Sequence, residues 1–316
     1  MTNFKLFREK LGPLGLLSVL SIFLITGVAT GCNPSTGPNI EPSPVPAVQE
    51  PQVDEKAILE AYNKLMTTSP QPKEVFEFLD QNVKKLSKEK VASMINDLEK
   101  LQKDHLPKLE ERFYKEEVQG EFGKLYMAKK DINNSTSAET EELKDLVVET
   151  AKSGYKVETA EGAFFPIVDY SAYKEYVQYM TEDLKAYIEI MSVESDKVPA
   201  KDAALVIPWE DLVRRAIRQE AFINKYADSS KLAEVKELHK NYMYFVFFGL
   251  NNTPLFDYQN KLMNEEAKAA YGKIDLNSSD SKVMENLKGY MELLEKDGYK
   301  LTKEVEKFRN DIVGKQ

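Results

Sequence analysis

The sequence contains little cysteine, histidine or tryptophan, with one Cys, two His and one Trp in 316 residues. A single cysteine cannot form a disulfide within the chain, so the folded part must be stabilised by its own core. His105 and His239 stand far apart, and no His-Glu-x-x-His occurs. Because zinc sites draw on several imidazoles or thiolates, we expect a structural or surface role for each histidine.

Glycine-rich motifs are also missing from the sequence. The 14 glycines are scattered and form neither a Walker loop nor a dinucleotide-binding pattern, and no Gly-x-Ser-x-Gly is present. The sequence therefore predicts no cofactor and no serine nucleophile of the hydrolase type. The sequence does not decide whether the protein is an enzyme, and the missing motifs favour a protein without enzymatic activity.

Positive charge is in deficit, with 43 Lys and Arg against 52 Asp and Glu and a net charge of −9. An acidic chain is repelled by nucleic acid and by anionic lipid surfaces. We therefore expect no nucleic-acid partner.

The N-terminus has the parts of an export signal. Lys5, Arg8 and Lys10 make it basic, and residues 11–28 are apolar or small. A run of about 18 residues could instead cross most of a bilayer as an uncleaved helix. However, residues 28–32 read VATGC, which puts small residues directly before a cysteine, and no Lys or Arg follows to stop transfer.

This ending resembles the lipobox of bacterial lipoproteins. The resemblance implies that residues 1–31 are a signal peptide cut off between Gly31 and Cys32, and that the thiol of Cys32 receives a diacylglycerol. It implies a lipid-anchored protein on the extracytoplasmic face of the cell membrane, and the lack of disulfides suits a Gram-positive cell. A plain signal anchor and a structural cysteine are the alternatives.

Residues 32–53 are expected to be a tether. Six prolines and almost no large apolar side chain occur between residues 33 and 52, so this segment cannot bury enough surface to fold. As an extended chain at about 3.1 Å per residue it would reach roughly 60 Å. A proline-rich ligand for a recognition domain is the alternative.

Residues 54–316 are predicted to form an all-α domain, an antiparallel array of many helices. Apolar residues recur at spacings of three and four, which indicates helices, and proline and glycine positions suggest where helices begin and end. Pro208 and Pro254 are placed in first turns, the latter after a cap at Thr253, and Gly298 is a helix stop. Two helices are predicted from their apolar spacing, one after a cap at Ser87 (Val91, Met94, Ile95, Leu98, Leu101, His105) and one after a cap at Ser171 (Tyr173, Tyr176, Val177, Met180, Leu184, Tyr187, Ile188, Met191).

One segment breaks the helical pattern. Residues 155–168 alternate polar with β-branched or aromatic side chains around Ala160-Glu161-Gly162, which predicts a small β-hairpin insertion closed by Pro166 near its end. The hairpin could equally be a seam between sub-units 54–153 and 154–316. It resembles glutamate-glycine-aromatic hairpins of uncharacterised lipoproteins of spore-forming bacteria, and this resemblance implies no activity.

A polar loop over residues 131–142 is a candidate calcium site. Its oxygen-bearing side chains occupy positions 1, 3, 5, 7, 9 and 12 of an EF-hand-like loop, although Thr136 replaces the usual glycine and Ala138 the usual large apolar residue. The alternative is a solvated loop that caps helices. The candidate ligands are Asp131, Asn133, Ser135, Ser137, Glu139 and Glu142.

Residues 241–258 form an aromatic segment that favours a buried core helix or, alternatively, a ligand groove. In the groove hypothesis, Phe164 and Phe165 also line the groove. Its predicted residues are Trp209, Tyr244, Phe247, Phe248, Asn251, Asn252 and Asp257.

Three functions remain open. We expect a binding or scaffolding module of the cell envelope, with an envelope protein or a wall polymer as partner. Adjacent acids such as Glu110-Glu111, Glu116-Glu117 and Glu265-Glu266 leave a carboxylate-dependent enzyme acting on wall polymers as an alternative. A calcium-responsive helical module is the third, and it depends on the loop over residues 131–142.

Overall fold

The computed structural model describes residues 55–275 and 281–314. The predicted signal peptide, the cleavage site at Gly31 and Cys32, and the predicted tether lie outside these residues. Within them, no helix is long and apolar enough to cross a membrane.

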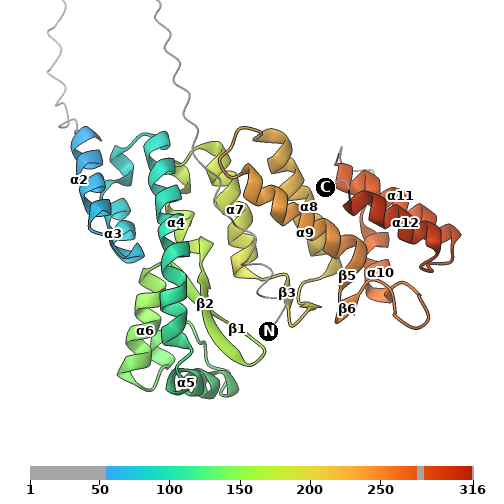
Figure 1. Ribbon diagram of the computed structural model, residues 1–316, viewed down its shortest axis with the longest axis horizontal. Coiled ribbons are helices and arrows are strands. Elements are labelled where there is room, and N and C mark those ends of the chain that lie inside the picture. Colours follow the sequence, from blue (N-terminus) through green and yellow to red (C-terminus); the bar gives the residue numbers. More distant parts are fainter. Residues whose placement is uncertain (1–54, 276–280, 315–316) are drawn as a thin grey trace, which may run out of the picture. The chain divides into compact units, whose positions relative to one another are not determined.

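The described residues form the expected all-α array, interrupted by three two-stranded antiparallel sheets (Figure 1). The α-helices are α2 (Glu55–Thr67), α3 (Pro72–Asn82), α4 (Lys88–Phe113), α5 (Glu116–Met127), α6 (Glu141–Lys152), α7 (Glu182–Asp196), α8 (Trp209–Lys225), α9 (Leu232–Phe248), α10 (Glu265–Lys273), α11 (Lys282–Lys296) and α12 (Lys303–Val313). The 3-10 helices are η1 (Val83–Lys85), η2 (Ser135–Ser137) and η3 (Tyr170–Tyr179). The strands are β1 (Tyr155–Ala160), β2 (Ala163–Val168), β3 (Ala200–Lys201), β4 (Ala204–Leu205), β5 (Gly249–Leu250) and β6 (Thr253–Pro254).

The long helix α4 organises the N-terminal half of this array. It packs against α3 on one stretch and against α5 and β2 on another (Figure 1), and η3 packs on α7. Further along the chain, α8 and α9 pack together and carry α10, α11 and α12. The helix predicted after Ser87 is confirmed, although the Ser87 hydroxyl donates to Glu55 instead of capping α4.

Three clusters of buried apolar side chains form the core. One lies among α8 to α12, one joins α2, α3, α4, η3 and α7, and one joins α5, α6, the hairpin and the C-terminal part of α4. The second cluster draws residues from both sides of residue 153. The core is therefore continuous across the predicted seam.

The predicted hairpin is confirmed as β1 and β2. Glu161 and Gly162 both have positive φ, +52° and +76°, which makes the tight turn that joins the strands. Pro166 pairs with Val157 in the middle of β2, and the strand continues to Val168. The hairpin therefore has the predicted bounds, and Pro166 lies two residues before its end without interrupting the strand.

The single helix predicted after Ser171 is wrong, because two helices meet at Met180. The 3-10 helix η3 ends there, and Met180 takes an extended backbone (φ −87°, ψ 163°) while its side chain is fully buried. The cap of η3 is Asp169, whose carboxylate accepts a hydrogen bond from Ser171 N at 3.1 Å. The apolar spacing continues across this break because η3 and α7 contribute buried side chains to the same core cluster.

The two proline predictions need correction, whereas the glycine stop is confirmed. Pro208 is the residue before α8 and not part of its first turn. Pro254 belongs to strand β6, where it pairs with Gly249. Gly249, with φ +72°, ends α9 and begins β5, and a Cβ there would meet Thr253 O at 2.4 Å. Gly298 has φ +62° just after α11 ends.

Candidate functional site

A cleft of about 390 Å³ lies where α3, η3 and the junction between α6 and β1 meet. This volume is within the range of small-ligand sites in proteins. Its lining residues are Lys73, Phe76, Glu77 and Asp80 from α3, Ala151, Lys152 and Gly154 from the junction, and Ala172, Glu175 and Tyr176 from η3.

Two aromatic rings form the apolar part of the cleft. The rings of Phe76 and Tyr176 stack with their centroids 6.3 Å apart, and Phe76 also lies 5.6 Å from the buried ring of Tyr173. Gly154 packs directly beneath Phe76: its φ is +70°, and a Cβ added to it would lie 2.5 Å from the ring. Only glycine therefore fits at this point of the wall.

Gln102 of α4 holds two walls of the cleft in place, the α6–β1 junction and η3. Its side chain is fully buried, and Nε2 donates to the carbonyl oxygens of Ser153 at 2.8 Å and Gly154 at 2.9 Å. Its Oε1 accepts a short hydrogen bond from the hydroxyl of Tyr173 in η3. The Tyr155 hydroxyl donates to the backbone oxygen of Gln102 at 2.8 Å. The junction and η3 are thus both tied to α4.

The third wall, α3, is tied to η3 by a side-chain hydrogen bond. The Tyr176 hydroxyl donates to Asp80 Oδ1 at 2.5 Å. Burial, followed by the hydrogen bond and charge of Asp80, raises the pKa of Tyr176, so the hydroxyl keeps its proton for this bond.

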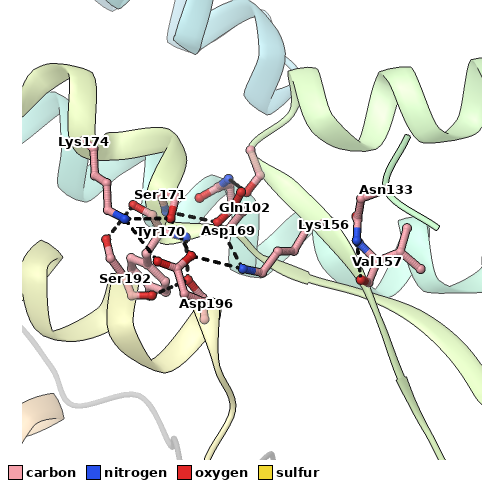
Figure 2. A network of polar contacts seen from close by, with 12 residues as sticks. Gln102, Asn133, Lys156, Val157, Asp169, Tyr170, Ser171, Lys174, Ser192 and Asp196 are labelled. Atoms are coloured by element: carbon pink, nitrogen blue, oxygen red, sulfur yellow. Dashed lines mark hydrogen bonds and ion pairs between the residues drawn. The ribbon is translucent and has the colours of Figure 1, made fainter. Parts of the chain in front are cut away.

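Asp196, the last residue of α7, accepts hydrogen bonds from three side chains (Figure 2). Ser171 donates at 2.6 Å, Lys174 at 3.1 Å and Lys156 at 3.4 Å. Lys156 also lies 3.5 Å from Asp169. Burial alone would raise the pKa of Asp196, but these hydrogen bonds and ammonium charges outweigh it and lower the pKa. The contact holds β1, η3 and α7 together.

Ser171 and Lys174 also have the Ser-x-x-Lys spacing used by some acyl-transfer enzymes. In those enzymes a group beside the serine must take its proton. Here Lys174 donates to Ser171 Oγ at 3.1 Å and is paired with Asp196. The pair therefore acts as a structural contact.

A buried charge cluster centres on Glu99 of α4. Its carboxylate accepts hydrogen bonds from Tyr170 and Tyr187, each at 2.6 Å, and forms ion pairs with Lys103 at 3.0 Å and with Lys231. Burial alone would raise the pKa of Glu99, but the two ammonium groups and the hydrogen bonds lower it to about 2. Glu99 is therefore ionised across the physiological range.

A second acid approaches this cluster from the surface. Glu234 accepts from Tyr187 at 2.8 Å and pairs with Lys103 at 3.1 Å. An acid–base pair for hydrolysis needs one carboxyl that keeps its proton, and the lowered pKa of Glu99 works against that.

Glu194 of α7 has a raised pKa, and its contacts are internal. Burial is the main cause of the rise, and hydrogen bonds from Tyr242 at 2.5 Å and Arg215 at 3.3 Å act against it. Both partners belong to α8 and α9, so Glu194 joins α7 to these helices.

The predicted calcium ligands are placed in structural contacts. Asp131 accepts from the backbone nitrogen of Asn133 at 2.9 Å, and the Asn133 side chain bonds to Val157 in β1. Residues Ser135–Ser137 form η2, which is capped by Asn134.

The acids of the same loop pair with lysines. Glu139 lies 3.9 Å from Lys130, and Glu142 lies 3.7 Å from Lys115. Across residues 55–275 and 281–314, no group of three or more His, Cys, Asp or Glu is arranged to hold a metal ion. Asp131, Asn133, Glu139 and Glu142 thus contact backbone groups and lysines.

The aromatic residues of the predicted groove are divided between core clusters. Trp209 is buried against Tyr271 with ring centroids 6.0 Å apart, and Phe247 is fully buried in the same cluster. Phe164 belongs to a different cluster, and Phe165 lies beside it in β2. These four side chains do not share one groove.

The remaining groove residues lie nearer the surface. Tyr244 is 46% exposed and stacks on Phe248 with centroids 4.8 Å apart. Asn251 and Asn252 form the turn between β5 and β6, while Asp257 accepts from two backbone nitrogens of the following turn. Of these residues, Tyr244 and Phe248 are in contact. Asn251 and Asn252 form a tight turn between two strands.

Local sequence patterns contain little signal for the cleft. Lys73, Phe76, Glu77 and Asp80 share one helix face by their spacing, but this pattern also describes an ordinary amphipathic helix. The opposing walls come from residues 151–176, and only the folded chain brings them to α3. No family model matches the chain, and neither a curated protein nor a solved structure matches it.

Proposed function

We propose that the protein is a lipid-anchored binding module on the extracytoplasmic face of the cell membrane, and that the cleft between α3, η3 and the α6–β1 junction is its ligand site. The anchor rests on the lipobox resemblance at Cys32. The ligand site rests on one observation: a cleft of ligand size combines an aromatic floor with charged side chains that are left unpaired around its rim.

The unpaired rim favours binding. Among the described residues, Lys73, Glu77, Lys152 and Glu175 line the cleft, and none of them forms an ion pair. Charges held at the mouth of a cleft are available to fix the orientation of a ligand.

The rigidity of the walls supports the same function. Buried hydrogen bonds from Gln102 and Tyr173 and a partly buried one from Tyr176 hold all three walls in place without a ligand. A preformed site loses less conformational freedom on binding, which favours affinity. The carboxylate-dependent enzyme is less well supported because Glu99 is held ionised and Glu194 is enclosed by Arg215 and Tyr242.

The anchor can be tested by metabolic labelling with an alkyne fatty acid in a Gram-positive host. The full chain should take up the label and fractionate with membranes. Cys32→Ser should take up none, while Ser35→Ala, a matched change in the neighbouring segment, should label normally. Equal labelling of the Cys32→Ser chain would overturn the anchor.

The ligand site can be tested by methyl NMR of the full-length lipidated protein in detergent, labelled with ¹³C at alanine. Ala151 and Ala172 line the cleft, and Ala216 and Ala267 are buried in the C-terminal cluster as references. A library of amino acids, short peptides and sugars should contain compounds that shift the first two methyl signals and spare the references. A library that shifts neither cleft methyl would contradict the proposal.

A further inference from the structure

We infer that the cleft takes a short zwitterionic peptide of about three residues, with its ammonium group at the Asp80 end and its carboxylate at the Lys73 end. This inference rests on the proposed binding function of the cleft and adds the chemical class of the ligand.

The α3 wall carries opposite charges at its two ends. Lys73 lies in the first turn of α3 and Asp80 in the last, seven residues away, which corresponds to about 10 Å along the helix axis. Glu74 caps the N-terminus of α3 by accepting from Gln71 N at 2.7 Å, so the positive charge offered to a ligand carboxylate at this end is that of Lys73. Lys152, on the junction side of the cleft, contributes a second ammonium group.

The acidic end is defined by the contact between α3 and η3. Tyr176 donates to Asp80 Oδ1, so this end of α3 faces η3, and Glu175 stands next to Tyr176 in the chain. The Tyr176 bond uses one oxygen of Asp80, while Glu77 lies one turn earlier on the same face. These carboxylates together favour an ammonium group.

The dimensions match a tripeptide. An extended chain spans about 3.3 to 3.6 Å per residue, so three residues place their terminal charges about 10 Å apart. Phe76 lies between Lys73 and Asp80 on α3, and its ring, which stacks on that of Tyr176, suits the apolar side chain of a central residue. A polyanion is disfavoured, since three carboxylates outnumber two lysines around the rim.

The first experiment compares three probes on the full-length lipidated protein in detergent. Trialanine should bind by calorimetry and shift the Ala151 and Ala172 methyl signals. N-acetyl-trialanine and trialanine amide, each lacking one terminal charge, should bind at least tenfold more weakly. Equal binding of all three peptides would overturn the inference, because the terminal charges would then have no role.

The second experiment assigns each terminus to its end of the cleft. Lys73→Gln should weaken trialanine binding about tenfold but change the binding of the amide little, because the amide has no carboxylate to lose. Asp80→Asn should likewise weaken trialanine binding about tenfold but change the binding of N-acetyl-trialanine little, because that peptide has no ammonium group to lose. Glu77→Gln covers the case in which Asp80→Asn disturbs the Tyr176 bond, and it should weaken trialanine more than N-acetyl-trialanine.

Two exposed residues away from the cleft serve as matched controls. Lys64→Gln in α2 and Glu89→Gln in α4 make the same chemical changes and should leave all three affinities unchanged. If Lys73→Gln weakens the amide as much as trialanine, the assignment of the ends is overturned.

The outcomes separate this inference from the proposed function. If trialanine does not bind while other compounds shift the Ala151 and Ala172 signals, the peptide inference is overturned and the binding function stands. If no compound shifts these signals, both are overturned.

Discussion

The side chain of Asn133 pairs with both backbone groups of Val157, donating from Nδ2 at 3.0 Å and accepting at Oδ1 from the nitrogen at 2.7 Å (Figure 2). On the other edge of the hairpin, Gln119 makes the same two bonds with Phe164, at 2.7 and 2.9 Å. Each amide thus occupies the place of a third strand. An isolated two-stranded sheet is marginal in water, and these contacts satisfy its open edges.

Asn133→Ala should therefore destabilise the protein by about 1 to 3 kcal/mol, because two backbone groups of β1 lose their partners. Chemical denaturation of the full chain followed by circular dichroism measures this change. Ser135→Ala, in the same loop, should cost much less.

Asn133→Asp distinguishes this role from calcium binding. A carboxylate keeps the acceptor for Val157 N but loses the donor for Val157 O, so stability should fall with or without calcium. If calcium raised the melting temperature of this variant above that of the wild type, the loop would be a metal site and the edge contact would be secondary.

Two glycines with positive φ give a second prediction. Gly162→Ala meets open space, so it should show only the backbone cost of a left-handed residue, about 1 kcal/mol. Gly154→Ala adds a contact of 2.5 Å with Phe76 and Gln102, and it should destabilise the protein by clearly more. Thermal denaturation of the two variants compares them directly, and similar losses would mean that Gly154 does not pack beneath Phe76.

The hairpin and the helices followed from local patterns in the sequence, but the cleft did not. Glu161-Gly162 marks a turn by its own chemistry, and Val91, Met94, Ile95 and Leu98 mark a helix by their spacing. These signals need no partner elsewhere in the chain.

Roles that depend on distant partners were missed. The side-chain oxygen of Asn133 is of the kind that binds calcium, so the sequence suggested a metal ligand. Its actual partner is Val157, 24 residues further along the chain, and no local pattern indicates that contact. The break at Met180 was hidden because η3 and α7 bury a common side, so the apolar spacing continues across it. Tyr176 was expected in a helix core, and its bond to Asp80, 96 residues earlier, makes it part of the cleft.

Gln102 and Gln219 are both fully buried glutamines, yet substitution should affect them in opposite ways. The side chain of Gln102 is bonded at both ends, whereas neither amide atom of Gln219 has a partner within the described residues. Gln102→Met should cost about 3 kcal/mol, because it leaves two carbonyl groups and the Tyr173 hydroxyl unsatisfied. Gln219→Met keeps the length of the side chain and should stabilise the protein by about 1 kcal/mol.

The measurement is the free energy of unfolding of both variants under identical conditions. A similar loss in both would indicate that Gln219 is bonded in solution, for example by a buried water. The contrast also tests the cleft, because Gln102→Met should weaken ligand binding there and Gln219→Met should not.

The charge cluster at Glu99 predicts how stability depends on acid. The pKa of Glu99 is about 2 in the folded protein, against 4.5 as the ordinary value, so the unfolded chain takes up its proton first as the pH falls. The stabilisation by this group is complete above about pH 4.5 and is lost progressively towards pH 2, with a total of about 3 kcal/mol.

Glu99→Gln should lower the free energy of unfolding at pH 7, because Lys103 and Lys231 lose a buried counter-charge. Between pH 4.5 and pH 2 its stability should fall less steeply than that of the wild type. Urea denaturation at a series of pH values measures both slopes, and Glu89→Gln, an exposed acid in the same helix, is the control that should follow the wild-type curve. Parallel curves for Glu99→Gln and the wild type would mean that Glu99 titrates alike in the folded and unfolded chains, and Tyr170, Tyr187 and the lysines would then not hold it as an ion.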